Sequence, residues 1–137
     1  MNLPKLVEFI AHIIQKPDVK IGVAPVIISP KQGIGKNFFM KIVTLLLGGR
    51  NVTQLYSDNV TSNFNAAIAS SQLVVVNESI GEKSKTYGAK NRNDQAMARI
   101  KSMITDYVQP IERKGIDIIT LKTYCNFIFM SNDISAV

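Results

Sequence analysis

The sequence has 137 residues, which suits one domain and is short for two. With 46% hydrophobic and 19% charged residues, the composition is globular and excludes a disordered chain. The single cysteine and single histidine exclude an internal disulfide and a Cys/His zinc site. The net charge of +6 favours polyanionic partners such as nucleotides or nucleic acid.

Two further observations concern location. No apolar run is long enough to span a membrane, so no membrane partner is expected. Cys125 lies in an apolar run, which indicates a small buried residue in a reducing compartment. We therefore expect a cytoplasmic protein.

The first elements in chain order are a helix, a strand and a second helix. Apolar residues recur at three- and four-residue steps from Leu3 to Ile14, which predicts an amphipathic helix that Pro17 ends. Residues 21–29 end in Val26-Ile27-Ile28, a β-branched run that predicts a strand buried on both faces. A loop follows at 30–35, and then an apolar helix at 36–47 that Gly48-Gly49 ends.

The rest of the chain continues this alternation, apart from a basic segment. Residues 82–94 contain several Lys and Arg and almost no apolar residues, which indicates a mobile basic loop. The expected elements are a strand at 52–56, a helix at 64–70, a buried strand at 73–77, a helix at 96–107, a hairpin of 108–111 and 116–121, and a last buried strand at 126–130. Strands that alternate with helices predict an α/β fold with a mostly parallel sheet flanked by helices. We expect one domain over 1–137, with an N-terminal helix and linker at 1–20 and a core at 21–137.

The segment Pro30 to Asn37 carries the most specific motif. The phosphate-loop template is G-x-x-x-x-G-K-[ST], placed between a strand and a helix. Here Gly33, Gly35 and Lys36 fit, whereas Pro30 replaces the first glycine and Asn37 the hydroxyl residue. Glycines let backbone N–H groups curl round a phosphate at the positive end of a helix, and the lysine reaches the β- and γ-phosphates. The segment favours phosphate binding, and the alternative is a glycine-rich turn with a chance lysine.

Two strand ends carry the other candidate groups. The strand at 73–77 ends in Asn77-Glu78, where related ATPases carry an acid that holds Mg²⁺ and a glutamate that polarises the attacking water. Glu78 fits the base, and Asn77 takes the place of the metal-binding acid. The alternative is a terminal glutamate that only caps the strand. The last strand ends in Ser131-Asn132, and such an end can place an amide between the two earlier strands, beside the γ-phosphate. The alternative is an ordinary strand end.

Together these residues resemble the superfamily 3 helicase branch of the AAA+ ATPases, in particular the C-terminal helicase domains of phage and viral primase–helicase replication proteins. The similarity spans about Val7 to Asp133. It rests on segments that match the family's order: Lys31 to Asn37, Phe64-Asn65, Asn77-Glu78, Lys101 to Gly115 with Glu112-Arg113-Lys114-Gly115, and Ser131-Asn132.

The resemblance implies a P-loop ATPase and DNA helicase that uses ATP and Mg²⁺ to move along single-stranded DNA as a homo-oligomeric ring, a hexamer, in a bacterial host or virus-infected cell. It implies three sets of site residues: nucleotide-binding Gln32, Gly33, Ile34, Gly35, Lys36, Asn37 and Phe38; magnesium-binding Asn37, Asn77 and Glu78; and catalytic Lys36, Glu78 and Asn132. It also implies DNA contacts from Lys101, Arg113 and Lys114 on a hairpin in the central channel. From the residues alone, a solvated turn is the alternative for that hairpin tip.

One departure concerns an arginine that family members carry after the last strand and that reaches the neighbouring subunit's nucleotide. The sequence ends before such a residue, so we expect a truncated core (a fragment, a split gene or a remnant) that hydrolyses ATP slowly. Two alternative functions stay open: a non-motor ATPase switch or loader, and a catalytically weak DNA-binding remnant.

Overall fold

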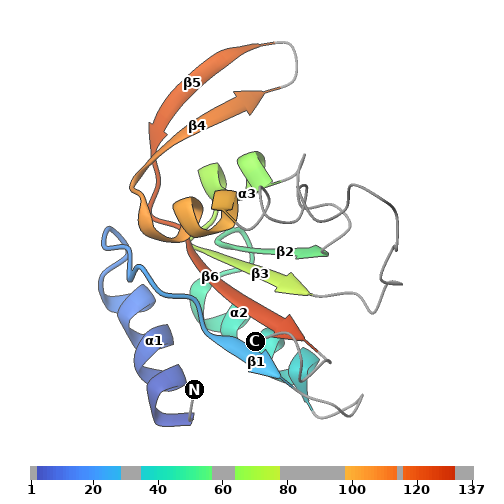
Figure 1. Ribbon diagram of the computed structural model, residues 1–137. Helices are drawn as coiled ribbons and strands as arrows, with labels where there is room; N and C mark the ends of the chain where they lie inside the picture. The colour runs from blue at the N-terminus through green and yellow to red at the C-terminus, as the bar shows by residue number, and fades with distance from the viewer. Residues whose placement is uncertain (1–2, 29–34, 57–63, 78–97, 114–115, 132–137) are drawn as a thin grey trace.

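The computed structural model describes residues 3–28, 35–56, 64–77, 98–113 and 116–131. They form a mixed α/β fold with a parallel sheet flanked by helices (Figure 1). The elements are α1 (Leu3–Gln15), β1 (Val26–Ile28), α2 (Lys36–Leu47), β2 (Val52–Tyr56), α3 (Phe64–Ser70), β3 (Leu73–Asn77), β4 (Val108–Arg113), β5 (Ile116–Lys122) and β6 (Asn126–Ser131). A further helical segment covers residues 98–105.

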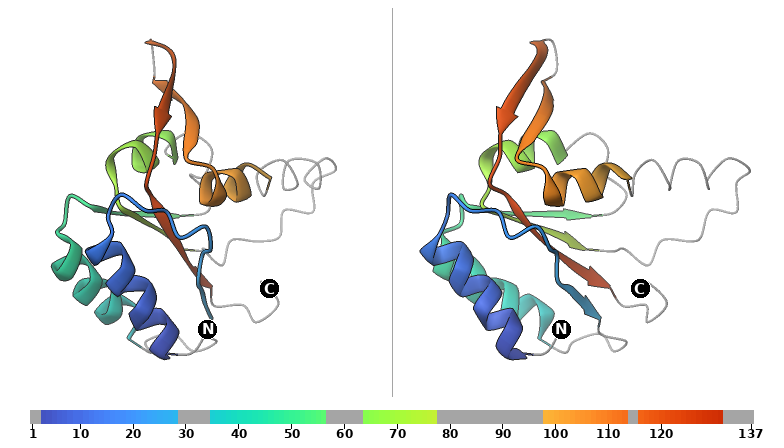
Figure 2. Two further views of the ribbon diagram at one scale, coloured as in Figure 1. Left: turned by 90° about the vertical axis from the view of Figure 1, so that its left-hand side faces the viewer. Right: turned by 60° about the vertical axis from the view of Figure 1, so that its left-hand side comes forward.

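The four-stranded sheet has the order β1-β6-β3-β2, and all its pairs are parallel. The last strand of the chain thus lies between the first and third strands. The antiparallel pair β4–β5 forms a separate hairpin that rises away from this sheet (Figures 1 and 2). Because parallel strands end at one edge, the carboxyl ends of β1, β6 and β3 lie side by side.

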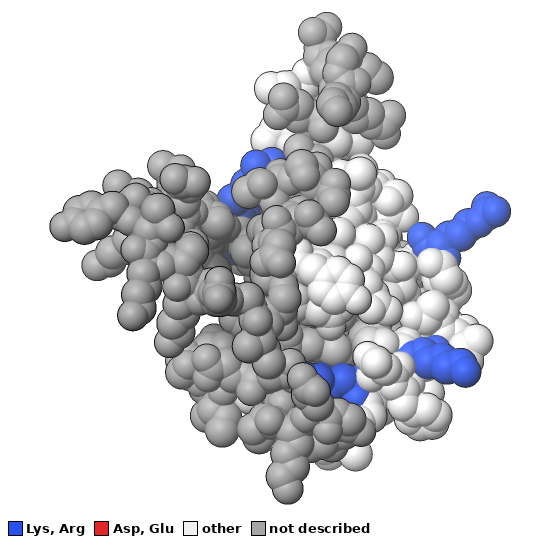
Figure 3. Space-filling view, turned by 90° about the vertical axis from the view of Figure 1, so that its right-hand side faces the viewer, with Lys and Arg blue, Asp and Glu red and all other residues white. Residues whose placement is uncertain are grey.

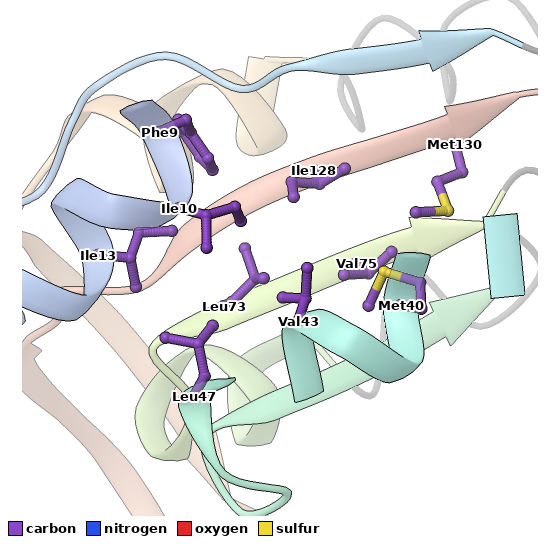
Figure 4. Packing of buried hydrophobic residues seen from close by; sticks show 10 residues of the cluster. All are labelled: Phe9, Ile10, Ile13, Met40, Val43, Leu47, Leu73, Val75, Ile128 and Met130. Atoms are coloured by element: carbon purple, nitrogen blue, oxygen red, sulfur yellow. The ribbon is translucent and has the colours of Figure 1, made fainter. Parts of the chain in front are cut away.

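One face of the sheet is covered by α1 and α2. Alternate side chains of β3 and β6 point to this face, since successive residues of a strand point to opposite sides. Figure 4 shows Leu73, Val75, Ile128 and Met130 packed against the buried side chains of the two helices. Those side chains are Phe9, Ile10 and Ile13 from α1 and Met40, Val43 and Leu47 from α2.

The intervening residues of the same strands form a second core on the opposite face. Val74, Val76 and Phe127 pack there with α3, the helical segment 98–105 and the hairpin. The partners from those elements are Ala67, Ile68, Met103 and Ile111, all at most 3% exposed. Each buried strand is therefore apolar on both sides, which explains its unbroken apolar sequence.

The prediction of a first strand buried on both faces is wrong. Only Val26–Ile28 is extended, Val26 is 38% exposed, and its two neighbours are half-buried. The physical reason is position: β1 is an edge strand that pairs only with β6. The sequence pattern identifies a β-branched run but not which strands will flank it.

The other predicted elements that fall on described residues are confirmed, with small differences in their bounds. The helix predicted at 96–107 ends at residue 105, and the hairpin strands extend to Arg113 and Lys122. Gly48 ends α2 with a φ of 86°, a positive value that glycine adopts without strain. Cys125 is buried, as predicted, with 1% of its surface exposed.

The outer surfaces of α1 and α2 remain strongly apolar. Between the two helices lies a cavity of about 340 Å³, lined by ten apolar residues: Leu3, Leu6, Val7, Ile10, Ala11, Ile14, Phe39, Ile42, Val43 and Leu46. Leu45, on the outer side of α2, is 75% exposed. Within the described ranges, no helix is long and apolar enough to cross a membrane.

Candidate functional site

The candidate site lies where β1, β6 and β3 end. The parallel register places Ile28 opposite Ser131, and Met130 opposite Asn77. The last residues of these three strands are therefore neighbours along one edge of the sheet. The three segments singled out in the sequence (the glycine-rich loop, the Asn77-Glu78 pair and Ser131-Asn132) all start from this edge.

The glycine-rich loop leads directly into the N-terminus of α2. Gly35 is the N-cap residue, with φ 75° and ψ 10°, in the left-handed region that glycine adopts most readily. It has no side chain to cap the helix, and the first turn of α2 has no acidic residue. The first N–H groups of a helix have no acceptors within the helix, so this end of α2 presents donors and a positive dipole to an anion.

The three predicted nucleotide-binding residues that directly follow Gly35 lie on the first turn of α2. Lys36 is half-buried, Asn37 is exposed, and Phe38 is 68% exposed, whereas the next residue, Phe39, packs against the core. Asn77 is half-buried at the end of β3. The structure thus brings the start of α2 and the end of β3 to the same edge of the sheet.

Other predicted site residues lie outside the described residues, namely Gln32, Gly33, Ile34, Glu78, Asn132 and Lys114. The predicted basic loop at 82–94 lies outside them as well, as do the first part of the Pro30 to Asn37 segment and the side chain of Arg113. Lys101 is described and is exposed on the helical segment 98–105. Among described residues, no group of three or more His, Cys, Asp or Glu could hold a metal ion.

The carboxyl edge of the sheet faces the viewer in Figure 3. Where described residues reach the surface on this face, the charged side chains in view are all Lys or Arg. A basic surface raises the local concentration of anionic ligands, whether nucleotide or nucleic acid. The described Lys and Arg side chains on this face therefore agree with the anion-binding geometry at the start of α2.

A buried lysine, which sequence reasoning missed, ties the N-terminal segment to the base of the hairpin. Lys20 is 6% exposed, and its Nζ donates hydrogen bonds to the carbonyl oxygens of Met103 (2.6 Å) and Asp106 (2.7 Å). These carbonyls lie at the C-terminal end of the helical segment 98–105, where a positive charge is favourable. Burial lowers the pKa of Lys20, while the nearby Cys125 and Asp106 act in the opposite direction.

The root of the hairpin carries a second group that the sequence analysis passed over. The rings of Tyr107 and Tyr124 meet edge to face, with centroids 6.0 Å apart and planes at 78°. The Nζ of Lys122 lies 5.7 Å from the centroid of Tyr107 and 5.4 Å from that of Tyr124. The available signal was a tyrosine at each end of the hairpin sequence, just outside the strands predicted there.

A family model described as a family of unknown function (DUF5906) matches residues 27–137. The chain belongs to this family. The match includes the whole four-stranded sheet except the start of β1, and it includes the hairpin and every candidate site residue. The family match thus covers both the carboxyl edge of the sheet and the root of the hairpin.

The chain is also similar to a phage replication protein. It is 28% identical over 129 residues to the DNA primase-polymerase of Nitratiruptor phage NrS-1, covering 93% of this chain and 17% of that protein. The apo structure of the NrS-1 C-terminal region matches with a TM-score of 0.74 and 25% identity, covering 96% of this chain and 30% of that one. A second apo structure of the same region, in an A form, has a TM-score of 0.70 at 24% identity, which supports the fold alone. This chain is thus related to part of the C-terminal region of the phage protein.

Proposed function

We propose that this chain is the ATP-binding and ATP-hydrolysing core of a phage-type replicative DNA helicase, acting in the replication of phage DNA. The observation that carries the proposal is the meeting of three strand ends at one edge of the sheet, with β6 between β1 and β3. A ligand bound at the loop after β1 would face the ends of β3 and β6 together. Open α/β sheets bind ligands at such a point, where the order of the strands departs from their sequence order.

The start of α2 supports the phosphate-binding part of the proposal. The left-handed Gly35 and the uncapped first turn of α2 suit a group with negatively charged oxygens. Lys36 follows at once, and we assign it to the β- and γ-phosphates, with the backbone of Gln32, Gly33, Ile34 and Gly35 round the same group. Asn37 and Phe38 complete the nucleotide-binding set on the exposed side of the first turn.

The ends of β3 and β6 supply the groups for hydrolysis in this proposal. Glu78, directly after β3, would accept a proton from the attacking water, and Asn132, directly after β6, would contact the γ-phosphate. Asn37, Asn77 and Glu78 would hold Mg²⁺, whose charge offsets that of the phosphates. Asn77 offers a neutral oxygen where an aspartate would offer a charged one, so we expect weaker Mg²⁺ binding than an aspartate would give.

The hairpin and the basic surface support the DNA-binding part. The hairpin β4–β5 extends away from the sheet (Figure 2). In this proposal Arg113 and Lys114, at the turn of the hairpin, contact single-stranded DNA in the channel of a homo-oligomeric ring, together with Lys101, which is exposed on the helical segment 98–105. Such basic groups track the phosphate backbone without reading sequence. The similarity to the C-terminal region of a DNA primase-polymerase favours a role on DNA for the same region here.

The test is the binding of a fluorescent ATP analogue with Mg²⁺ to the wild-type chain and to Lys36→Ala. Loss of binding in Lys36→Ala, with binding retained in Lys41→Ala, would support the phosphate site. Lys41 is a matched control because it is an exposed lysine on the same helix, one turn further from the sheet edge. Equal binding by all three proteins, or binding by none, would rule out the ATPase for this chain.

Asn77, at the position where related ATPases carry a metal-binding acid, favours a second candidate. This candidate is a DNA-binding remnant or a nucleotide-dependent switch without motor activity. A motor requires hydrolysis that single-stranded DNA stimulates, whereas a remnant requires DNA binding that is indifferent to ATP and Mg²⁺. Steady-state phosphate release with and without single-stranded DNA separates the two. We expect slow hydrolysis by a monomer, because the nucleotide of a ring helicase also needs an arginine from the neighbouring subunit, worth about 10³–10⁵ in rate where such residues have been measured.

A further inference from the structure

The inference concerns the root of the hairpin, where Lys122 lies beside the paired rings of Tyr107 and Tyr124. Tyr107 is 37% exposed, Tyr124 is half-buried, and Lys122 is exposed. Both separations between the ammonium and a ring centroid are within the roughly 6 Å at which a cation and an aromatic face attract. The group thus combines two aromatic rings and one positive charge at the protein surface.

Both tyrosines are held in place from behind. The Tyr107 hydroxyl accepts a hydrogen bond from the backbone N–H of Lys20 at 3.1 Å, and the carbonyl of Tyr107 accepts one from the N–H of Thr123 at 2.7 Å. The carbonyl of Tyr124 accepts a hydrogen bond from the side-chain amide of Asn126, whose own oxygen accepts one from the N–H of Ile21. Because these hydrogen bonds already order both tyrosines, the binding of a stacked ligand costs the protein little additional conformational entropy.

The hairpin links this root to the tip. Its residues alternate: Gln109 and Ile111 are buried, whereas Val108 is 57% and Ile118 is 65% exposed, and Lys122 stands opposite Val108 in the register. Where side-chain exposure is described, over residues 108–111 and 118–122, one face of the hairpin is therefore open to solvent. The seven residues of β5 span about 20 Å at the usual rise of a strand.

The acidic group nearest in sequence to the tyrosine pair, Asp106, already accepts hydrogen bonds from its own segment. The Asp106 carboxylate accepts hydrogen bonds from Ser102 at 2.7 Å and from Thr105 at 2.9 Å, and these bonds lower its pKa. Lys20, on the other side of Tyr107, directs its ammonium into the protein toward backbone carbonyls. The exposed positive charge at the hairpin root is that of Lys122.

We propose that Tyr107, Tyr124 and Lys122 form a binding platform for one unpaired nucleotide of a single-stranded nucleic acid, the ring pair taking the base and the lysine its phosphate. Bases stack on aromatic side chains without regard to sequence, and Lys provides a flexible point charge for the backbone. A strand that contacts the basic tip would run along the open face of the hairpin and end at this platform. The inference rests on the DNA-binding part of the proposed function and is independent of the nucleotide site.

The test is fluorescence anisotropy of a labelled oligo-dT with the full chain, titrated at several salt concentrations. We expect Tyr124→Leu to weaken binding about tenfold, a typical effect of losing one stacked base. Lys122→Gln should weaken binding and reduce the slope of log affinity against log salt by about one, as expected when one phosphate contact is lost. The matched controls are Tyr56→Leu, because Tyr56 is 56% exposed on β2, and Lys41→Gln on α2. Both controls should match the wild-type protein.

Two further variants keep the result interpretable. Tyr124→Phe retains the ring and should keep the wild-type affinity even if Tyr124→Leu fails to fold. Tyr107→Phe keeps the ring but removes the hydroxyl that bonds the backbone of Lys20, so it should weaken binding less than Tyr124→Leu does. A Lys122→Gln variant with an unchanged salt slope, or a folded Tyr124→Leu that binds as well as Tyr56→Leu, would overturn the platform.

The failure of this inference is distinct from failure of the proposed nucleotide site. Loss of oligo-dT binding in Tyr124→Leu while the ATP analogue still binds would place the defect at the platform. No oligo-dT binding by the wild-type chain would overturn the platform and leave the nucleotide site standing. Equal affinity for oligo-dT and a duplex of the same length would also overturn it, because the bases of a duplex are already stacked on one another.

Discussion

The two faces of the four-stranded sheet are covered in different ways. On one face, α1 and α2 pack on the sheet through a cluster of buried apolar side chains, and a cavity of about 340 Å³ lies between the helices. On the other face, the apolar core is accompanied by the buried polar residues Lys20, Gln109 and Asn126, each of which forms a hydrogen bond with backbone near the hairpin.

The difference is one of directionality. Hydrophobic burial stabilises an element without fixing its orientation, whereas a buried hydrogen bond is lost if the partner turns away. The side chain of Gln109, for example, donates to the carbonyl oxygen of Ser102 at 3.0 Å and so fixes β4 against the preceding helical segment. On the face that carries the hairpin, hydrogen bonds therefore fix the orientation of the hairpin relative to the sheet. This suits a hairpin that presents a ligand-binding surface.

The largest effect should come from the apolar cores, and it should be similar on both faces. Phe127 and Ile128 are adjacent in β6, fully buried, and point to opposite faces. We expect Phe127→Ala to lower the free energy of unfolding by about 3–5 kcal/mol and Ile128→Ala by about 2–5 kcal/mol, because each leaves a cavity. Urea denaturation measures both. A loss under about 1 kcal/mol for either variant would mean that its face contributes little to stability.

A smaller effect should separate the two faces. Lys20→Met keeps an apolar stem but removes the ammonium that donates to the carbonyl oxygens of Met103 and Asp106. We expect a loss of about 2 kcal/mol, in the range for hydrogen bonds to a charged group. Lys16→Met, at an exposed position just before it, is the control and should be neutral. If the two variants were equally stable, the hydrogen bonds of Lys20 would contribute nothing measurable to the stability of the hairpin face.

A still smaller effect is expected at the start of α2, on the other face. Gly35→Ala should cost about 1 kcal/mol, because a Cβ is disfavoured at the left-handed φ of 75° although nothing lies within 4 Å of it. It should also weaken binding of the ATP analogue, since the loop conformation would shift. The control is Gly49→Ala, whose φ is not in the left-handed region and whose Cβ would meet Thr44 at an ordinary 4.0 Å. Equal stability of both variants would argue against a required left-handed Gly35.

The smallest effect on stability is expected from the ionisation of the Cys125 thiol, which can also be followed by its rate of reaction with a thiol reagent. Burial raises the pKa of this thiol to about 12, so the folded protein should react slowly with a thiol reagent at pH 8. The neutral thiol favours the folded state fully below pH 9, and this contribution is lost as the pH rises through 12. Lys20→Met should speed the reaction by loosening the hairpin face, whereas Lys16→Met should not. Fast modification of the wild-type chain at pH 8 would contradict the burial.

Local pattern was enough to predict most elements of this chain. The recurrence of apolar residues in α1, the unbroken apolar runs of β3 and β6, and Gly48 after α2 each depend on neighbours in sequence, so they can be read without the fold. The same is true of Gly35 and Lys36 between a strand and a helix. Their placement at a helix N-terminus is confirmed, while their role with ATP stays a prediction.

Only the tertiary structure decided which segments became neighbours. The exposure of β1 follows from its place at the edge of the sheet, and the burial of Lys20 from two carbonyl groups more than eighty residues later in the chain. The pairing of Tyr107 with Tyr124 likewise depends on the closure of the hairpin between them. The sequence by itself determined the type and extent of the local elements, because periodicity and turn chemistry act over a few residues. The fold alone decided edge, burial and the meeting of strand ends, because these depend on contacts between distant parts of the chain.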